Sequence, residues 1–182
     1  NQDISNWNVS SVEDMSLMFT DATAFNKDIS SWDVSSVSNM YGMFSWATSF
    51  NKNLSSWDVS SVKEMGWMFQ FAKSFDQDIS SWNVSNVTDM GYMFSEAESF
   101  NQDLSNWDVS GVTYCNSFNA FATAWTEPKP NFTNCSIEGS SSGRKSWTKP
   151  EGAIKKKRSD AVNIKDTGIG KETDPKQMPL LK

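Results

Sequence analysis

Apolar residues recur along the first 125 residues with a period of 25, and polar residues fill most positions between them. Tryptophan shows the period most clearly, because it returns at the same place in each unit: Trp7, Trp32, Trp57, Trp82 and Trp107. Two valines and several methionines and phenylalanines keep the same register. A fixed period of this size is typical of a solenoid, in which each unit buries its apolar face only against its neighbours.

The first part of each unit predicts a short strand. In the unit at residues 26–50, Trp32 and Val34 alternate with Asp33. Alternation with period two indicates that the tryptophan and the valine point inward and the aspartate points outward. Stacking the units would then place these strands side by side in a parallel sheet.

The second part of each unit predicts a short helix. From Val37 to Ala47 the spacing between apolar residues becomes 3, 3, 1 and 3, which matches one face of a helix. Ser36 is suited to cap its first turn. We therefore expect an α/β solenoid of about five repeats with short parallel strands and short helices; the alternative is a parallel β-helix-like solenoid.

The repeat reads L/I-x-x-W-x-V-x-x-V-x-x-M-x-x-M-F-x-x-A-x-x-F-N, and matches extend from residue 1 to about residue 136. This pattern resembles the BspA-like leucine-rich repeat family of surface proteins, and more closely the 25-residue repeat type of mycoplasma lipoproteins. The resemblance implies a curved, leucine-rich-repeat-like solenoid at a cell surface. It also implies a role in adhesion and no enzymatic activity of the repeats themselves.

Charge divides the chain into two parts. Residues 1–125 hold 4 Lys and 15 Asp or Glu, a net of 4 − 15 = −11, whereas residues 126–182 hold 12 basic and 7 acidic residues, a net of +5. An acidic repeat array argues against nucleic acid as a partner. The chain has no histidine, the commonest general base and metal ligand, so we expect no catalysis, no cofactor and no metal site.

The sequence gives no sign of a membrane span, because no apolar stretch approaches the roughly 20 residues that a transmembrane helix needs. The chain opens in the middle of the repeat pattern at Asn1. We interpret it as a fragment of a longer protein, so that a signal peptide or anchor would lie elsewhere.

The fifth unit departs from the pattern and predicts a cap at about residues 111–136. Cys115 and Phe118 replace methionines, and Trp125 replaces the last phenylalanine. End repeats must hide their last apolar face from water, so atypical residues are expected there. A disulfide between Cys115 and Cys135 would staple this cap and would agree with an extracellular setting; the alternative is two buried thiols.

Beyond the cap no periodicity survives. We therefore divide the chain into a repeat domain at residues 1–136 and a flexible, disordered basic tail at residues 137–182.

One candidate binding surface is the outward residue between tryptophan and valine of each unit. We call this set the outer column: Asn8, Asp33, Asp58, Asn83 and Asp108. In a leucine-rich repeat these residues would lie on the concave face, where partners bind. Stacked carboxylates repel one another, so a basic partner, calcium, or hydrogen bonds from neighbouring serines would relieve them. The last alternative makes the column a set of turn residues.

A second candidate is a group of aromatic residues that does not repeat from unit to unit. Trp67 and Phe71 lie four residues apart, with Trp46 and Tyr92 at corresponding places in the neighbouring units. Exposed aromatic residues gathered in this way favour contact with a protein or a carbohydrate. Alternatively, they cover the flanks of the helices and are half-buried.

These observations predict a non-catalytic, cell-surface or secreted module, monomeric, that presents a binding surface to protein or glycan partners in adhesion. The alternative is a passive structural spacer in a larger surface protein. A binder needs a patch that does not repeat, and the aromatic group is such a patch.

Overall fold

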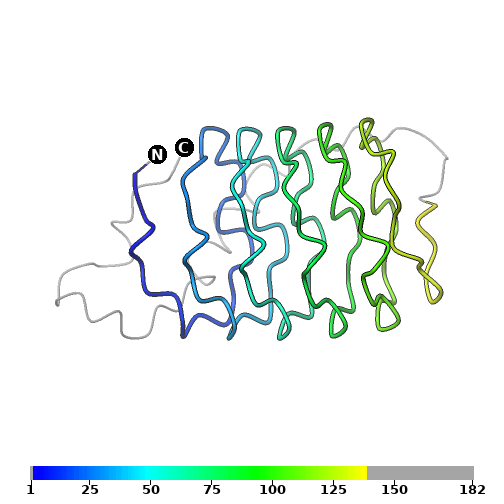
Figure 1. Cartoon of the computed structure of the whole chain (residues 1–182), viewed down its shortest axis with the longest axis horizontal. Helices are drawn as coiled ribbons and strands as arrows, with labels where there is room; N and C mark the ends of the chain where they lie inside the picture. The colour runs from blue at the N-terminus through cyan, green and yellow to red at the C-terminus, as the bar shows by residue number, and fades with distance from the viewer. Residues whose placement is uncertain (1, 139–182) are drawn as a thin grey trace, which may run out of the picture.

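The computed structural model describes residues 2–138, which form a stack of coils with one coil for each 25-residue repeat. We number them coil 1 (2–25), coil 2 (26–50), coil 3 (51–75), coil 4 (76–100) and coil 5 (101–125). Successive coils lie side by side along the long axis, and the cap at residues 126–138 follows the last of them (Figure 1). The predicted tail lies, from residue 139 onward, outside the described residues.

The predicted α/β solenoid of strands and helices is wrong. Residues 2–138 contain no helix and no named strand. Neighbouring coils are joined by isolated parallel bridges between Asp14 and Asn39, Asn39 and Glu64, Glu64 and Asp89, and Asp89 and Tyr114. The parallel β-helix alternative needs continuous strands, which this part of the chain also lacks.

Tight turns take the place of both elements. In coil 1 an amide donates to the carbonyl three residues earlier in six places, and each bond closes a turn: Trp7 to Ile4, Val12 to Val9, Met18 to Met15, Thr20 to Leu17, Ala22 to Phe19 and Phe25 to Ala22. A turn closed by residues i and i+3 brings both side chains to one side, so it accommodates the apolar spacing that predicted a helix. A helix is impossible here because Leu17 and Asp21 have φ of 60° and 62°, far from the helical value of about −63°.

Backbone amides between these turn amides bind the next coil. The N–H groups of Leu17 and Phe19 donate to the carbonyls of Tyr41 and Met43, both at 2.8 Å. Alternate amides therefore serve the turns and the stack, so that buried backbone groups are satisfied. This ladder runs through the segment that predicted a helix.

The segment that predicted a strand is held differently. Among the described residues no backbone hydrogen bond joins the stretch Trp32–Val34 to a neighbouring coil. The indole N–H of Trp32 donates instead to the carbonyl of Ile4 in coil 1, at 3.1 Å. Ser36, expected to cap a helix, donates its hydroxyl to the carbonyl of Ser10 at 2.8 Å. Side chains therefore replace the predicted sheet.

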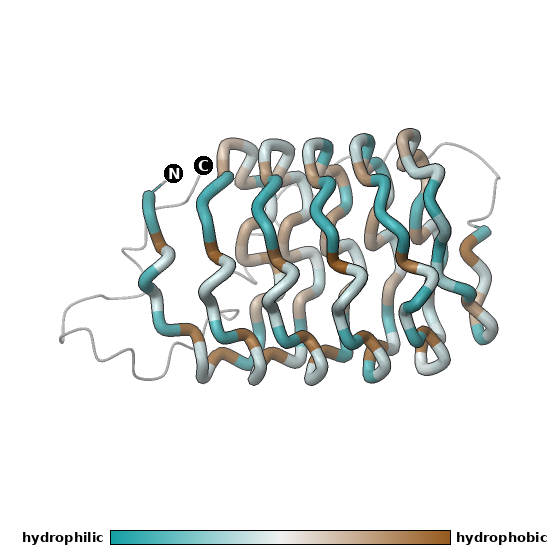
Figure 2. The backbone as a smooth tube through the Cα atoms, viewed as in Figure 1, coloured by the Kyte–Doolittle hydropathy of each residue, from teal (hydrophilic) through white to brown (hydrophobic). Residues whose placement is uncertain are grey.

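The predicted core is confirmed. Trp32 and Val34 are buried and Asp33 is exposed, although no strand sets that alternation. Phenylalanine rings stack from coil to coil, with centroids 5.6 Å apart between Phe44 and Phe69. Figure 2 shows the apolar positions at matching levels in successive coils. Each coil thus buries its apolar residues against the coils on either side.

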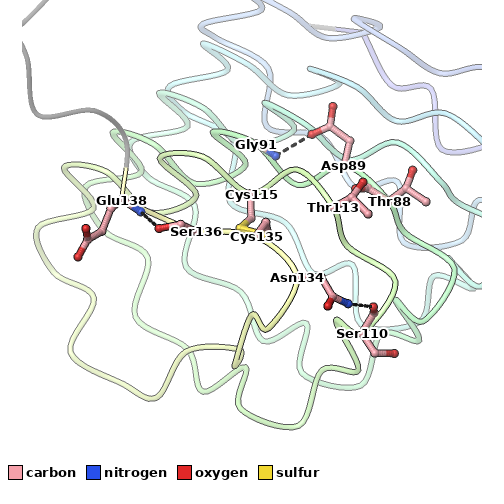
Figure 3. The surroundings of a disulfide bond; sticks show 10 residues. All are labelled: Thr88, Asp89, Gly91, Ser110, Thr113, Cys115, Asn134, Cys135, Ser136 and Glu138. Atoms are coloured by element: carbon pink, nitrogen blue, oxygen red, sulfur yellow. Dashed lines mark hydrogen bonds between the residues drawn. A yellow bond between two sulfur atoms is a disulfide. The ribbon is translucent and has the colours of Figure 1, made fainter.

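The predicted disulfide is also confirmed. Cys115 and Cys135 are joined at an Sγ–Sγ distance of 2.07 Å (Figure 3). The amide of Ser117 donates to the carbonyl of Ile137 at 3.1 Å, and the ring of Phe132 meets that of Phe118 edge-on at 5.0 Å. The cap thus continues the ladder and packs against the core of coil 5.

Candidate ligand-binding surfaces

The outer column closes turns. Oδ1 of Asp33 accepts hydrogen bonds from the amide of Ser35 at 3.1 Å and from its hydroxyl at 2.6 Å. Asp58 binds Ser60 in the same way, at 3.0 Å and 2.6 Å. The asparagines and Asp108 bind the serine two residues later in the same manner. The side chains remain exposed, but their oxygens already accept hydrogen bonds from backbone amides.

These hydrogen bonds outweigh the repulsion between stacked carboxylates. The hydroxyl of Ser35, and then its amide, hold the pKa of Asp33 below its ordinary value, and the charge of Asp58 opposes them only weakly. Hydrogen bonds from Ser60 and Ser110 likewise lower the pKa of Asp58 and Asp108. The column therefore needs no cation to stay ionised.

A matching column, which sequence reasoning missed, runs five residues earlier in each coil. Oδ1 of Asp28 accepts the amide of Ser30 at 2.9 Å. The other members make the same bond: Asp3, Asn53, Asp78 and Asp103. The signal was present in the sequence, because D-I-S-S-W at residues 28–32 is followed directly by D-V-S-S-V. Two columns of turn-closing residues thus share one structural task.

The non-repeating aromatic residues pair across neighbouring coils. Trp46 and Phe71 stack with centroids 3.9 Å apart, and Tyr92 meets Trp67 edge-on at 5.8 Å. Tyr41, which sequence reasoning missed, also stacks on Trp67, with ring centroids 5.6 Å apart. All five side chains are half-buried. We call these five residues, Tyr41, Trp46, Trp67, Phe71 and Tyr92, the aromatic face.

Most of the aromatic face occupies an unusual backbone conformation. Trp46 and Trp67 have φ of 62°, and Phe71 and Tyr92 have φ of 56°. Positive φ is uncommon for bulky residues and favours Gly, Asn or Asp. Gly42 takes it at the place equivalent to Trp67, with φ of 60°. The fold therefore accepts small residues where this chain carries large aromatic ones.

Two carboxylates stand three residues before rings of the aromatic face, Glu64 before Trp67 and Asp89 before Tyr92. Glu64 and Asp89 are bridge partners on adjacent coils, and we call them the acidic pair. Asp89 lies over Gly66, since a Cβ there would stand 3.0 Å from its Oδ1. Burial, and then the charge of Asp89, raise the pKa of Glu64 above its ordinary value. Burial also raises the pKa of Asp89, although the Gly91 amide opposes this.

Burial and Asp89 of the acidic pair raise the pKa of two neighbouring phenols. Burial, followed by the charges of Asp89 and Tyr114, raises the pKa of Tyr41 to about 12. Tyr114 is exposed, and its ring lies over Gly91. Burial, followed by Tyr92 and Asp89, raises its pKa as well. Rings and carboxylates thus form one electrostatically connected group.

Replacing Asp89 with asparagine should stabilise the protein at neutral pH. Asn39 occupies the equivalent place in coil 2 and accepts the amide of Tyr41 at 2.9 Å, as Asp89 accepts that of Gly91 at 2.8 Å. The raised pKa means that ionised Asp89 opposes folding above its folded-state pKa, and this cost disappears below the unfolded pKa. Urea unfolding should therefore show a small gain at pH 7 that vanishes in acid.

Asp33→Asn is the matched control, because the pKa of Asp33 is shifted the other way. Its charge favours folding above the unfolded pKa, so this variant should lose a little stability at pH 7 and nothing in acid. A loss of stability at pH 7 in Asp89→Asn would contradict the assignment of a desolvated carboxylate.

No helix within residues 2–138 is long and apolar enough to cross a membrane. Within the same residues, no three Asp, Glu, His or Cys side chains cluster closely enough to hold a metal ion.

The model of one protein family, described as "Mycoplasma protein of unknown function, DUF285", matches residues 1–74 and 51–143. No curated protein and no solved structure matches the chain. The overlapping matches cover the coils and the cap.

Proposed function

Because the chain belongs to the family of mycoplasma proteins of unknown function DUF285, we propose that it is a non-catalytic, BspA-like surface module. It presents a binding surface to a protein or glycan partner in adhesion. The observation that carries this proposal is the aromatic face: five half-buried aromatic side chains on coils 2–4.

The backbone conformation of these residues is strained, which lowers the stability of the folded protein. A non-glycine residue at positive φ costs on the order of 1–3 kcal/mol, and a ring pair returns about 0.5–1.5 kcal/mol. Stacking of Trp46 on Phe71 therefore offsets only part of the strain at both residues. Glycine at the same places would relieve it, as Gly42 does. Contact with a partner would account for aromatic residues in these positions.

The disulfide supports a location outside the cell. Disulfides persist in oxidising compartments and are rare in reducing ones. Cys115 and Cys135 are the two cysteines of the chain, and they are paired. This bond therefore fits a secreted or surface-bound module.

An adhesion assay on host cells or matrix-coated plates tests the proposal. The variant Trp67→Ser with Phe71→Ser removes the centre of the aromatic face. Serine suits position 67 because Ser117 has φ of 54° at the equivalent place, and Asp21, with φ of 62°, shows that a small polar residue is accepted at the place equivalent to Phe71. Loss of two central aromatic contacts should weaken adhesion about tenfold or more.

The matched control replaces Asp33 and Asp58 with asparagine. Asn8 and Asn83 stand at equivalent positions and bind their serines in the same way, so the turns survive. Adhesion of this variant should stay near that of the wild type. Equal adhesion of all three proteins would sink the proposal and favour the passive spacer, whereas a loss confined to the control would move the binding surface to the outer column.

A further inference from the structure

We propose that the aromatic face and the acidic pair together bind a positively charged polypeptide segment, with a lysine or arginine side chain seated beside Glu64 and Asp89. This inference rests on the proposed function, because it names the class of partner that the same surface takes. Its basis is that aromatic rings and uncompensated carboxylates occupy the same patch.

The acidic pair lacks a cation of its own. Glu64 and Asp89 are paired across adjacent coils, which places their backbones about 4.8 Å apart. Each carboxyl is partly buried. Burial and acidic or hydrogen-bonding neighbours shift the pKa of each, and no basic side chain contributes to either shift. Lys73 pairs instead with Glu98, at 2.7 Å. An incoming cation would therefore meet two carboxylates whose charges are not offset.

The surrounding rings favour the same kind of ligand. Trp67 lies between Tyr41 and Tyr92, and the phenol of Tyr114 is electrostatically coupled to both Tyr92 and Asp89. Cations are attracted to ring faces, most strongly to tryptophan. The chain already makes such a contact, since Nζ of Lys129 lies 5.2 Å from the ring centre of Trp125. Aromatic residues and carboxylates thus act in the same direction on a bound ammonium or guanidinium group.

Charge complementarity favours a basic polypeptide over a glycan. The first 125 residues hold 15 acidic and 4 basic residues, so the surface attracts cationic partners and repels anionic ones. A neutral glycan would gain ring contacts and hydrogen bonds but no ion pair with the acidic pair, and a sialylated or sulfated one would be repelled. A lysine or arginine side chain uses both features.

Fluorescence anisotropy with a labelled peptide of alternating lysine and glycine tests this inference. The wild type should bind, and Glu64→Gln with Asp89→Asn should weaken binding roughly tenfold, since the carboxylates and the rings act together on one cation. The control, Asp33→Asn with Asp58→Asn, removes the same charge from the outer column. It should bind nearly as well as the wild type, which separates a local site from general attraction to an acidic protein.

The outcomes distinguish this inference from the proposed function. Equal weakening by both double variants would overturn the inference, because only net charge would then matter. Binding of a neutral oligomer of N-acetylglucosamine that is lost in Trp67→Ser, without binding of the lysine peptide, would also overturn it while leaving a glycan-binding function intact. If Trp67→Ser with Phe71→Ser leaves both adhesion and peptide binding unchanged, the proposed function fails as well.

Discussion

Truncating Phe69 to alanine should lower the free energy of unfolding by about 3–5 kcal/mol. The side chain is fully buried, and its ring contacts phenylalanine rings of its own coil and of both neighbouring coils. Its ring centroid is 4.0 Å from that of Phe75 and about equally distant from Phe44 and Phe94, at 5.6 Å and 5.5 Å. The cavity would open in coil 3, at the centre of the stack, where coils on both sides depend on the same contacts.

Urea unfolding followed by tryptophan fluorescence measures this loss. Phe121→Ala is the matched control, because Phe121 is 58% exposed and its truncation should change stability by less than about 0.5 kcal/mol. A loss below about 1 kcal/mol in Phe69→Ala would contradict a core built from continuous ring columns.

Removing the disulfide should cost about 3 kcal/mol, since it closes a loop with a sequence separation of 20 residues. The double variant Cys115→Ala with Cys135→Ala tests this without placing a hydroxyl at Cys115, which is fully buried. The cap should loosen first, because it packs against the stack on one side only.

Wild-type protein under a strong reductant serves as the comparison and should unfold at the same urea concentration as the alanine variant. The reductant should not affect the variant itself. Unchanged stability of the reduced wild type would mean that the hydrogen bond from Ser117 to Ile137 and the contact of Phe132 with Phe118 hold the cap unaided.

The sequence predicts the core and the disulfide correctly, because the first follows from apolar periodicity and the second from its interruption. Trp32 and Val34 are buried and Asp33 is exposed, as alternation requires whether or not a strand forms. Cys115 stood out because it replaces a methionine of the repeat, and Cys135 because it is the one other cysteine of the chain. Burial is therefore readable from the repeat alone.

Backbone conformation was not readable in the same way. Spacing of 3, 1 and 3 fits a helix and fits a series of turns, since both place residues i and i+3 on one side. A warning was available in Gly42, Gly66 and Gly91, which lie inside the predicted helices, where glycine is unfavourable. The ladder of alternate amides depends on the next coil, and contacts between units are not visible in one unit's propensities.

The candidate surfaces were predicted in part. Trp46, Trp67, Phe71 and Tyr92 were found because they do not repeat, and the structure brings them together in pairs. Tyr41 was missed because it stands one residue before the position that Trp67 and Tyr92 occupy in their coils. The acidic pair was missed because its residues stand three residues before that position. Their proximity arises from stacking between coils, as does the burial that raises the pKa of Asp89.

We infer that the non-repeating aromatic face, and not the regular columns, binds the partner. Titration with the lysine–glycine peptide, followed through the tryptophan indole signals in ¹H–¹⁵N spectra, tests this inference. Trp46 and Trp67 are half-buried, whereas Trp57 and Trp82 donate their indole N–H groups to the carbonyls of Ile29 and Leu54 inside the stack. We expect the Trp67 signal to move while those of Trp57 and Trp82 stay in place. A stationary Trp67 signal, with shifts instead at the amides of Ser35 and Ser60 beside the outer column, would contradict it.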